Sequence, residues 1–534
     1  MKGWILMKNK LLISVTVFLL ILTSCSIPSA KEDYKASPRP NPILNLISKP
    51  MPIPQNYNVE GLGFNITVLS DMQMDDSYQP YFIRFTSDSL DLKISKEKSP
   101  YDDLDMYFNK YIYKYLLNET FQKANEIKLV EHKSTTINGY NTKIVVLSRD
   151  AANLSSKDYY YQAIIVTGKR DFYMLNFKTS EPNKDTQRIN DIINSFKATE
   201  AKPPSFALKF KPDSSDLGGE ALDYYNKIKN ADNVEWGIFY PASLKPFDKF
   251  KEIEQKINYK FPVMLHYIYL GHEFPKSTLE QAYEDDKIVE LTLQTMWSVL
   301  PEDTADNKNT MHSTVYDIID GEYDEYLRDF ARQLKDFGHP VLFRLNNEMN
   351  GTWTVYSGIA SMCDPDLYIE AWRHIYRIFE EQQVDNALWI FNPNDRDYPP
   401  LNWNNQVCYY PGDGYVHLIG VTGYNTGNYF EKKTGEKWRS FNEIFKHIDD
   451  RFGVMYRDYP WIVTEFASNS VGGDKQAWIR EMFNSMHNYP NIKIAVWWSY
   501  FDPDPTTKKP ARKYWLDEKE KYLMEFKKGL EMSK

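Results

Sequence analysis

From about residue 218 onward, the chain alternates short apolar runs with longer segments of helical hydrophobic spacing. Short apolar runs bounded by polar turns are typical of buried strands, and apolar residues at every third or fourth position are typical of amphipathic helices. We expect eight strands, at residues 236–240, 262–269, 288–295, 341–345, 388–391, 417–421, 461–464 and 492–498. We expect helices between most of them, at residues 247–257, 278–284, 323–337, 367–382, 441–451, 475–487 and 518–532.

Eight strand–helix units in roughly 315 residues predict a closed (β/α)8 barrel, the TIM-barrel fold of the α/β class, over residues 218–534. The alternative is an open doubly wound sheet, which would place a glycine-rich phosphate-binding turn after its first strand. The residues at that position, Trp236-Gly-Ile-Phe-Tyr-Pro241, are not such a turn. The sequence therefore favours the barrel, in which an active site would lie at the carboxyl ends of the strands.

A second domain precedes the barrel. Residues 59–198 read as a small α+β domain, with strands at 63–68, 81–86, 90–94, 159–167 and 172–178 and helices at 103–117 and 185–196. Residues 135–148 contain Asn138-Gly139 between two extended runs, which is a strong hairpin signal. This pattern resembles the Mog1/PsbP-like domains of bacterial lipoproteins. It contains no catalytic constellation, so we expect a spacer or interaction role, and residues 199–217 read as a linker.

The amino terminus has the pattern of an export signal. Lys8 and Lys10 precede the apolar run 11–22, which is too short to favour a permanent membrane span. The small residues before Cys25 resemble a bacterial lipobox, which implies that residues 1–24 are removed and that the Cys25 thiol is lipidated. The alternative is ordinary signal-peptidase cleavage near Ala30. We expect an exported protein, lipid-anchored to the cell membrane through a flexible tether at residues 25–58.

Composition narrows the choice of partners and cofactors. The chain has 64 Lys and Arg residues against 73 Asp and Glu residues, a net charge of −9, which argues against a nucleic-acid partner. The nine histidines and three cysteines form no cluster with metal-ligand spacing, so we expect no metal or other cofactor. Cys363 and Cys408 can pair outside the cell or stay free, and their spacing does not decide between these states.

Two glutamates carry the candidate chemistry. Glu348 follows the fourth predicted strand and Glu465 follows the seventh, so a closed barrel brings both to one mouth. A carboxyl pair at such a mouth can cut a glycosidic bond, because one group protonates the leaving oxygen while the other attacks or stabilises the sugar cation. A solvated surface position is the ordinary alternative for either glutamate alone. The shared strand context favours the catalytic interpretation.

Four stretches of the predicted barrel resemble glycoside hydrolase family 26, which belongs to the retaining clan whose fourth and seventh barrel strands end in glutamate. They are 318–326, Arg344-Leu-Asn-Asn-Glu-Met-Asn-Gly-Thr-Trp353, 410–425 and Thr464-Glu-Phe466. The family is best known for endo-β-1,4-mannanases. The resemblance implies that Glu348 is the general acid/base and Glu465 the nucleophile.

The same resemblance suggests supporting residues. Arg344 matches the buried arginine that steadies the nucleophile, and strand alternation would put Arg344, Asn346 and Glu348 on one side. Tyr424 matches a tyrosine whose hydroxyl donates to the nucleophile.

Two tryptophans are candidate sugar contacts. Trp497 or Trp498, at the end of the eighth predicted strand, should form the sugar platform, and we favour Trp497. Trp353 would stack on a sugar just beyond the cleavage point, with core packing as the alternative.

One position departs from the family pattern. Members usually carry histidine immediately before the acid/base, and this chain has Asn347. In the wider clan an asparagine there binds the 2-hydroxyl of the sugar that is cleaved, and mannose and glucose differ at that hydroxyl. We therefore expect a retaining endo-β-1,4-mannanase, with β-glucan and β-xylan as open alternatives. A carbohydrate-binding lipoprotein without catalysis is the alternative from another class.

Overall fold

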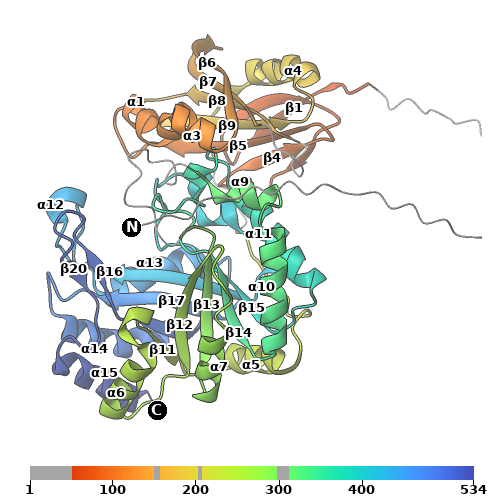
Figure 1. Ribbon diagram of the computed structural model, residues 1–534. Coiled ribbons are helices and arrows are strands. Elements are labelled where there is room, and N and C mark those ends of the chain that lie inside the picture. Colours follow the sequence, from red (N-terminus) through yellow and green to blue (C-terminus); the bar gives the residue numbers. More distant parts are fainter. Residues whose placement is uncertain (1–50, 150–156, 203–206, 298–311, 534) are drawn as a thin grey trace, which may run out of the picture. The chain divides into compact units, whose positions relative to one another are not determined.

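The computed structural model describes residues 51–149, 157–202, 207–297 and 312–533 (Figure 1). The predicted signal peptide, Cys25 and most of the predicted tether lie outside these residues. In the described part of the chain, no helix combines the length and the apolar character that a membrane crossing needs.

Eight parallel strands close into a barrel, in the order of the sequence. They are β11 (Glu235–Phe239), β12 (Val263–Tyr269), β13 (Ile288–Gln294), β14 (Val341–Leu345), β15 (Ala387–Phe391), β16 (Leu418–Asn425), β17 (Trp461–Ser468) and β18 (Ile492–Trp498). The last strand pairs with the first, with Glu235 opposite Ile494, and this pairing closes the cylinder. The predicted barrel is confirmed, and the open doubly wound sheet is excluded.

Helices surround this barrel and follow the predicted spacing (Figure 1). They are α6 (Pro246–Ile257), α7 (Lys276–Glu284), α10 (Asp324–Phe337), α11 (Pro365–Glu381), α13 (Phe441–Phe452), α14 (Lys475–Ser485) and α15 (Glu520–Met532), with α5 (Gly219–Lys229) before the first strand and α9 (Thr314–Ile319) before α10. Helix α10 buries Leu327, Phe330, Ala331 and Leu334, one stripe at helical spacing. The β15–β16 connection instead forms three short 3-10 helices, η4 (Asn402–Asn404), η5 (Gln406–Tyr409) and η6 (Asp413–Tyr415).

Alternation along each strand separates the barrel interior from the helix layer. On β18, Ile494 and Val496 belong to the interior cluster, together with inward residues such as Leu342 of β14. Ala495 belongs to the cluster formed with the surrounding helices. The inward positions of the strands therefore lead up to the mouth of the barrel.

The amino-terminal domain contains two antiparallel sheets and is α+β, as predicted. The larger has the order β3 (Gln73–Asp75), β4 (Ile83–Thr86), β5 (Leu90–Lys98), β9 (Asp171–Thr179), β8 (Tyr159–Val166), β7 (Tyr140–Arg149) and β6 (Ile127–Ile137). The smaller contains β1 (Pro54–Val59), β2 (Phe64–Leu69) and β10 (Lys197–Ala198). Asn138-Gly139 forms the predicted hairpin turn between β6 and β7, with both residues at positive φ.

Helices complete this domain, and its start differs from the expectation. The predicted helix 103–117 is α1 (Leu104–Tyr107), a π-helical turn η1 (Phe108–Ile112) and α2 (Tyr113–Leu116), with α3 (Glu119–Ala124) after them, and α4 (Pro182–Ser195) packs against β2 and β9. Strand β1 begins at Pro54, inside the predicted tether 25–58, because its residues pair with β2 from Pro54 to Val59. The predicted tether boundary at residue 58 is therefore wrong. Residues Pro52–Lys534 form one compact unit that contains both domains.

The described residues contain neither a disulfide nor a metal-binding cluster. Cys363 and Cys408 are both free and buried. Among the described residues, no group of histidine, cysteine, aspartate and glutamate side chains is arranged to hold a metal ion.

Candidate active site

An irregularity in β17 aims Glu465 at the barrel interior. Val463 pairs with Val421 of β16, but the next pair is Glu465 with Thr422, so the register shifts by one residue at Thr464. Such a β-bulge re-aims the side chains around it and is common beside active sites. The strand continues to Ser468, so Glu465 lies within β17 rather than just past it. The bulge is thus the local feature that turns this carboxylate toward the mouth.

Two donors bind the Glu465 carboxylate, one to each oxygen. The Arg344 guanidinium donates to Oε1 at 2.8 Å, and the Tyr424 hydroxyl donates to Oε2 at 2.8 Å. Glu465 and Arg344 are both buried. Arg344 is itself fixed from below, since its Nε donates to Thr292 and its Nη1 to Asn392. The two hydrogen bonds fix the orientation of the Glu465 carboxylate at the mouth.

Glu348 lies beyond the end of β14, where the backbone changes conformation. Asn346 and Glu348 have φ values of 60° and 55°, which strand residues do not adopt. The Glu348 amide donates to the carbonyl of Asn392 at 2.8 Å, which fixes the turn against the neighbouring strand end. Because the alternation stops at Leu345, the expectation that Asn346 shares a side with Arg344 and Glu348 is wrong. The Asn346 side chain instead accepts from the backbone of Thr295.

The surroundings of Glu348 favour a protonated carboxyl. Burial raises the pKa of Glu348 to about 8, and the negative charge of Glu465 acts in the same direction. The indole Nε1 of Trp353 donates to Oε2 of Glu348 at 2.9 Å and opposes this rise. Glu348 can therefore hold a proton near neutral pH, within electrostatic reach of Glu465.

Asn347 faces the inner wall at the mouth. Its Oδ1 accepts from Nε2 of Gln294 at 2.7 Å and from the Tyr356 hydroxyl at 2.9 Å. Within the described part of the chain, its Nδ2 group makes no hydrogen bond. The amide therefore has a fixed acceptor side and a donor side that a sugar hydroxyl can use.

Trp353 is not a core residue. Its side chain is 49% exposed, and its ring lies 5.6 Å from the ring of Tyr398, which is 40% exposed. The Trp353 ring stands beside Glu348, and Tyr398 extends the exposed aromatic surface on which a sugar can stack. No pattern in the sequence singles out Tyr398, because it lies in the long connection after β15.

Trp497, the expected sugar platform at the end of β18, does not reach the mouth of the barrel. Trp497 is fully buried, donates to the carbonyl of Tyr514 and packs edge-on against Phe466, so it lies under the helices and not in the mouth. Trp498 has the inward parity of Ile494 and Val496, and its ring lies 6.0 Å from that of Tyr424. Successive side chains of a strand point to opposite faces, so Trp497 points to the helices while Trp498 faces the mouth.

Glu290 is a buried carboxyl that the sequence analysis missed. It lies on β13, with Oε1 at 3.1 Å from Nε of Arg344, and both side chains are fully buried. Burial raises the pKa of Glu290 to about 8, and the charge of Glu465 adds to the rise. A protonated Glu290 carries no negative charge, so the positive charge of Arg344 interacts mainly with Glu465. The available signal was a glutamate in the middle of the apolar run Ile288-Val-Glu-Leu-Thr-Leu293.

Comparison with known proteins gives one family match. The model of glycosyl hydrolase family 26 matches residues 295–449, which include Glu348 and Tyr424 but end before Glu465. Endoglucanase H of Acetivibrio thermocellus is 34% identical over 184 residues, which are 34% of this chain and 20% of that protein. A mannan endo-1,4-beta-mannosidase of Bacillus subtilis is 36% identical over 110 residues, 19% of this chain and 28% of that protein. The matches thus span between a fifth and a third of these relatives.

Solved structures with similar chains include a family 26 beta-mannanase from Bacteroides ovatus and an endo-beta-1,4-mannanase catalytic domain from Bacillus sp. JAMB-750. The first has 15% identity and a TM-score of 0.43 and covers 59% of this chain and 93% of its own. The second has 16% identity and a TM-score of 0.42 and covers 61% of this chain and 93% of its own. The fold assignment depends on the strand pairing of this molecule alone. The family match runs across β14, β15 and β16, so this part of the barrel is similar to glycosyl hydrolase family 26.

Proposed function

We propose that the barrel domain is a retaining glycoside hydrolase that cuts β-1,4-mannan internally. The observation that carries the proposal is the pair of glutamates in unlike surroundings at one mouth: burial raises the pKa of Glu348, and Arg344 and Tyr424 each donate a hydrogen bond to Glu465. A retaining reaction requires both groups, at a separation of about 5–5.5 Å.

The surroundings give each group its step. The ionised Glu465 attacks the anomeric carbon, while the proton of Glu348 goes to the leaving glycosidic oxygen. The attack turns Glu465 into a neutral ester, so its charge no longer raises the proton affinity of Glu348. The carboxylate left on Glu348 then takes a proton from water, and that water releases the sugar with its configuration retained.

Two substrates have specific support. β-1,4-Mannan is supported by the family and by relatives named mannan endo-1,4-beta-mannosidase. β-Glucan is the second candidate, because the relative named Endoglucanase H shares the longer matched stretch and because Asn347 stands where the family usually has histidine. A site discriminates strongly at a hydroxyl that it is built to hydrogen-bond. The donor side of Asn347 is such a group, so we expect this residue to set the preference at the 2-hydroxyl.

Product analysis tests the proposal. The purified protein is incubated with mannan, glucomannan, mixed-linkage β-glucan and xylan, and products are separated while proton NMR follows the first anomer formed. We expect oligosaccharides from mannan, released first as the β-anomer. Release of the α-anomer would exclude Glu465 as a nucleophile. Binding to these glycans without any cleavage would favour the non-catalytic carbohydrate-binding alternative.

We further propose that the protein is exported and held at the cell membrane by lipid on Cys25. The motif around Cys25 supports this placement, and the glycan substrate is extracellular under the proposed function. Expression of the full chain and of Cys25→Ala in a bacterial host, followed by membrane fractionation, tests it. We expect the parent in the membrane fraction and the variant in the soluble exported fraction. Equal distribution of the two would contradict the lipid anchor.

A further inference from the structure

The small domain contacts the barrel on the side where the active site lies. Its strand β5 ends near Glu97, and the Glu97 carboxylate accepts two backbone amides of the β15–β16 connection. The amide of Asn402 donates to Oε2 at 2.7 Å, and the amide of Trp403 donates to Oε1 at 2.9 Å. The Asn402 side chain adds a hydrogen bond to the carbonyl of Lys96. This connection follows the carboxyl end of β15 and is therefore a loop of the mouth.

The burial of Glu97 is unusual for a carboxylate. It is 1% exposed, and no lysine, arginine or histidine of the described ranges forms an ion pair with it. Burial raises the pKa of Glu97 to about 7, while hydrogen bonds from the Ser95 side chain and from the amides of Asn402 and Trp403 oppose the rise. A buried carboxyl without a cation is costly, and a purely structural contact could use an uncharged side chain instead. The arrangement points to a specific requirement for an acceptor of two amides at this place.

A chain of hydrogen bonds leads from this contact to the acid/base segment. Asn404, next to Trp403, donates through Nδ2 to the carbonyl of Asn350 at 2.9 Å. The amide of Tyr398 donates to the same carbonyl at 2.8 Å. Asn350 lies two residues after Glu348 and three before Trp353, whose indole binds Glu348.

We propose that Glu97 is a positioning residue for the active site: it fixes the β15–β16 connection, which in turn holds the segment that carries Glu348 and Trp353. The effect on activity rests on the proposed function, whereas the effect on the connection does not. The small domain is thereby a part of the catalytic unit and not a spacer.

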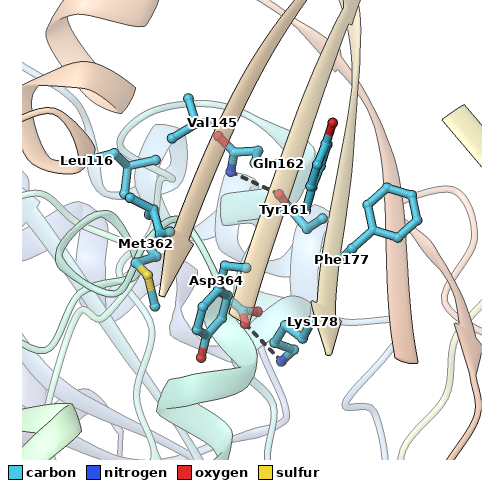
Figure 2. A pocket seen from close by; sticks show the side chains of 11 residues that line it. Leu116, Val145, Tyr161, Gln162, Phe177, Lys178, Met362 and Asp364 are labelled. Atoms are coloured by element: carbon cyan, nitrogen blue, oxygen red, sulfur yellow. Dashed lines mark hydrogen bonds and ion pairs between the residues drawn. The ribbon is translucent and has the colours of Figure 1, made fainter. Parts of the chain in front are cut away.

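Other contacts join the two domains without touching this chain of hydrogen bonds. Lys178 of β9 pairs with Asp364, just before α11, at 2.9 Å (Figure 2). Arg149 at the end of β7 pairs with Asp320 in the β13–β14 connection. The cavity in Figure 2, between Tyr161 and Met362, measures about 20 Å³, which suits one water molecule and excludes a sugar as its occupant. Variants at these contacts therefore show what a weakened contact between the two domains does when the Glu97 hydrogen bonds are left intact.

The test compares variants of the full chain. Glu97→Gln keeps the size of the side chain but has one oxygen for two amides, and Arg149→Met breaks a docking contact elsewhere. Glu131→Gln, in an exposed pair with Lys133 on the same domain, controls for the substitution itself. Hydrogen exchange is followed on peptides that cover 348–354 and 395–405. We expect about tenfold faster exchange there in Glu97→Gln, and no change in Glu131→Gln.

Activity gives the second measurement. The kcat/KM is measured on the polysaccharide and on an aryl β-glycoside whose leaving group needs no proton. If Glu97 positions the acid, Glu97→Gln lowers kcat/KM about tenfold on the polymer and less than twofold on the aryl glycoside. Asn404→Ala, which removes the second link, should reproduce this selectivity, and the double variant should lose no more than the stronger single variant.

Three outcomes overturn the inference. Unchanged exchange at 348–354 and 395–405 in Glu97→Gln would do so whatever the protein hydrolyses. Equal losses on both substrates, or the same changes in Arg149→Met, would reduce Glu97 to a docking contact. If the parent cleaves no glycan, the proposed function fails while the exchange experiment still tests the hydrogen-bonded chain.

Discussion

The ends of β14 and β17 carry the same side chain in opposite surroundings. At β17, Glu465 receives a guanidinium and a phenol hydroxyl, one on each oxygen. At β14, Glu348 is only partly buried and receives a single indole N–H. Two chemically identical groups thus have different hydrogen-bond donors and different charged neighbours. Under the proposed function, this difference is what assigns the role of acid to Glu348 and the role of nucleophile to Glu465.

The wall below the mouth supports this asymmetry. Arg344 lies between Glu290 and Glu465, but only Glu465 receives two hydrogen bonds from donors in the site. The pKa of Glu290 is raised to about 8, so near neutral pH Glu290 is protonated and adds little negative charge. The Arg344 guanidinium is therefore paired mainly with the Glu465 carboxylate at the β17 side. The β14 side has no such cation within hydrogen-bond reach of Glu348 among the described residues.

Removing the β17 carboxylate should have the largest effect. Glu465→Ala deletes the nucleophile, so we expect kcat on the polysaccharide to fall by about 10⁴-fold or more. The measurement is release of reducing ends by the purified variant, with circular dichroism to verify the fold. Glu431→Ala, on the short helix α12 (Glu431–Thr434), is the matched exposed control. Activity near the parental level in Glu465→Ala would show that the two strand ends do not divide the roles as argued.

Removing the β14 carboxyl should have a smaller and selective effect. In Glu348→Ala the leaving oxygen loses its proton donor, so kcat/KM on the polysaccharide should fall by about 10²–10⁴-fold. Substrates with activated aryl leaving groups need no proton and should lose much less. Azide should then accelerate turnover of the aryl glycoside and yield a β-glycosyl azide. Uniform losses on both substrates, with no azide product, would contradict the assignment of the acid to β14.

Weakening the donors at β17 sharpens the comparison further. Tyr424→Phe removes the hydroxyl bound to Oε2 of Glu465 and keeps the ring. A hydrogen bond to a charged group contributes about 1.5–3 kcal/mol, so we expect kcat to fall about 10- to 100-fold. Tyr514→Phe is the control, because its ring lies 5.0 Å from that of Tyr424 and its hydroxyl faces Asp502. Equal losses in both variants would mean that the phenol contact is not specific.

The barrel could be predicted because its signals are local. The strands β14 and β18 have the predicted bounds, since each is an apolar run between polar turns. The order of strands along the chain placed Glu348 and Glu465 at one mouth. Parity would also have favoured Trp498 over Trp497 if the inward face of β18 had been known. A run that is apolar on both faces does not reveal which face is inward.

The finer features of the site are not local. The bulge at Thr464 and the positive φ of Asn346 depend on the neighbouring strands, so alternation counted from sequence fails there. The role of Glu290 depends on its contact with Arg344, which lies on the next strand and cannot be paired with it from sequence spacing. The contact of Glu97 with Asn402 joins residues 305 positions apart, and no sequence pattern in either segment predicts it. Pairings of this kind are established by the folded structure and not by periodicity.

The smallest change tests the single donor at β14. Trp353→Phe keeps an aromatic ring but removes the indole N–H that binds Glu348. That donor favours the ionised carboxylate and lowers the pKa of Glu348, so without it the pKa rises above its value of about 8. The acid must be protonated to act, and activity is lost as pH rises through this pKa. The alkaline limb of kcat/KM, measured from pH 6 to 10, should therefore move upward by up to about one pH unit. Tyr398→Phe keeps its ring beside Trp353 and should leave the limb unchanged. A limb that moves downward in Trp353→Phe would mean that the indole contact stabilises the protonated carboxyl, which reverses the electrostatic argument for the β14 end.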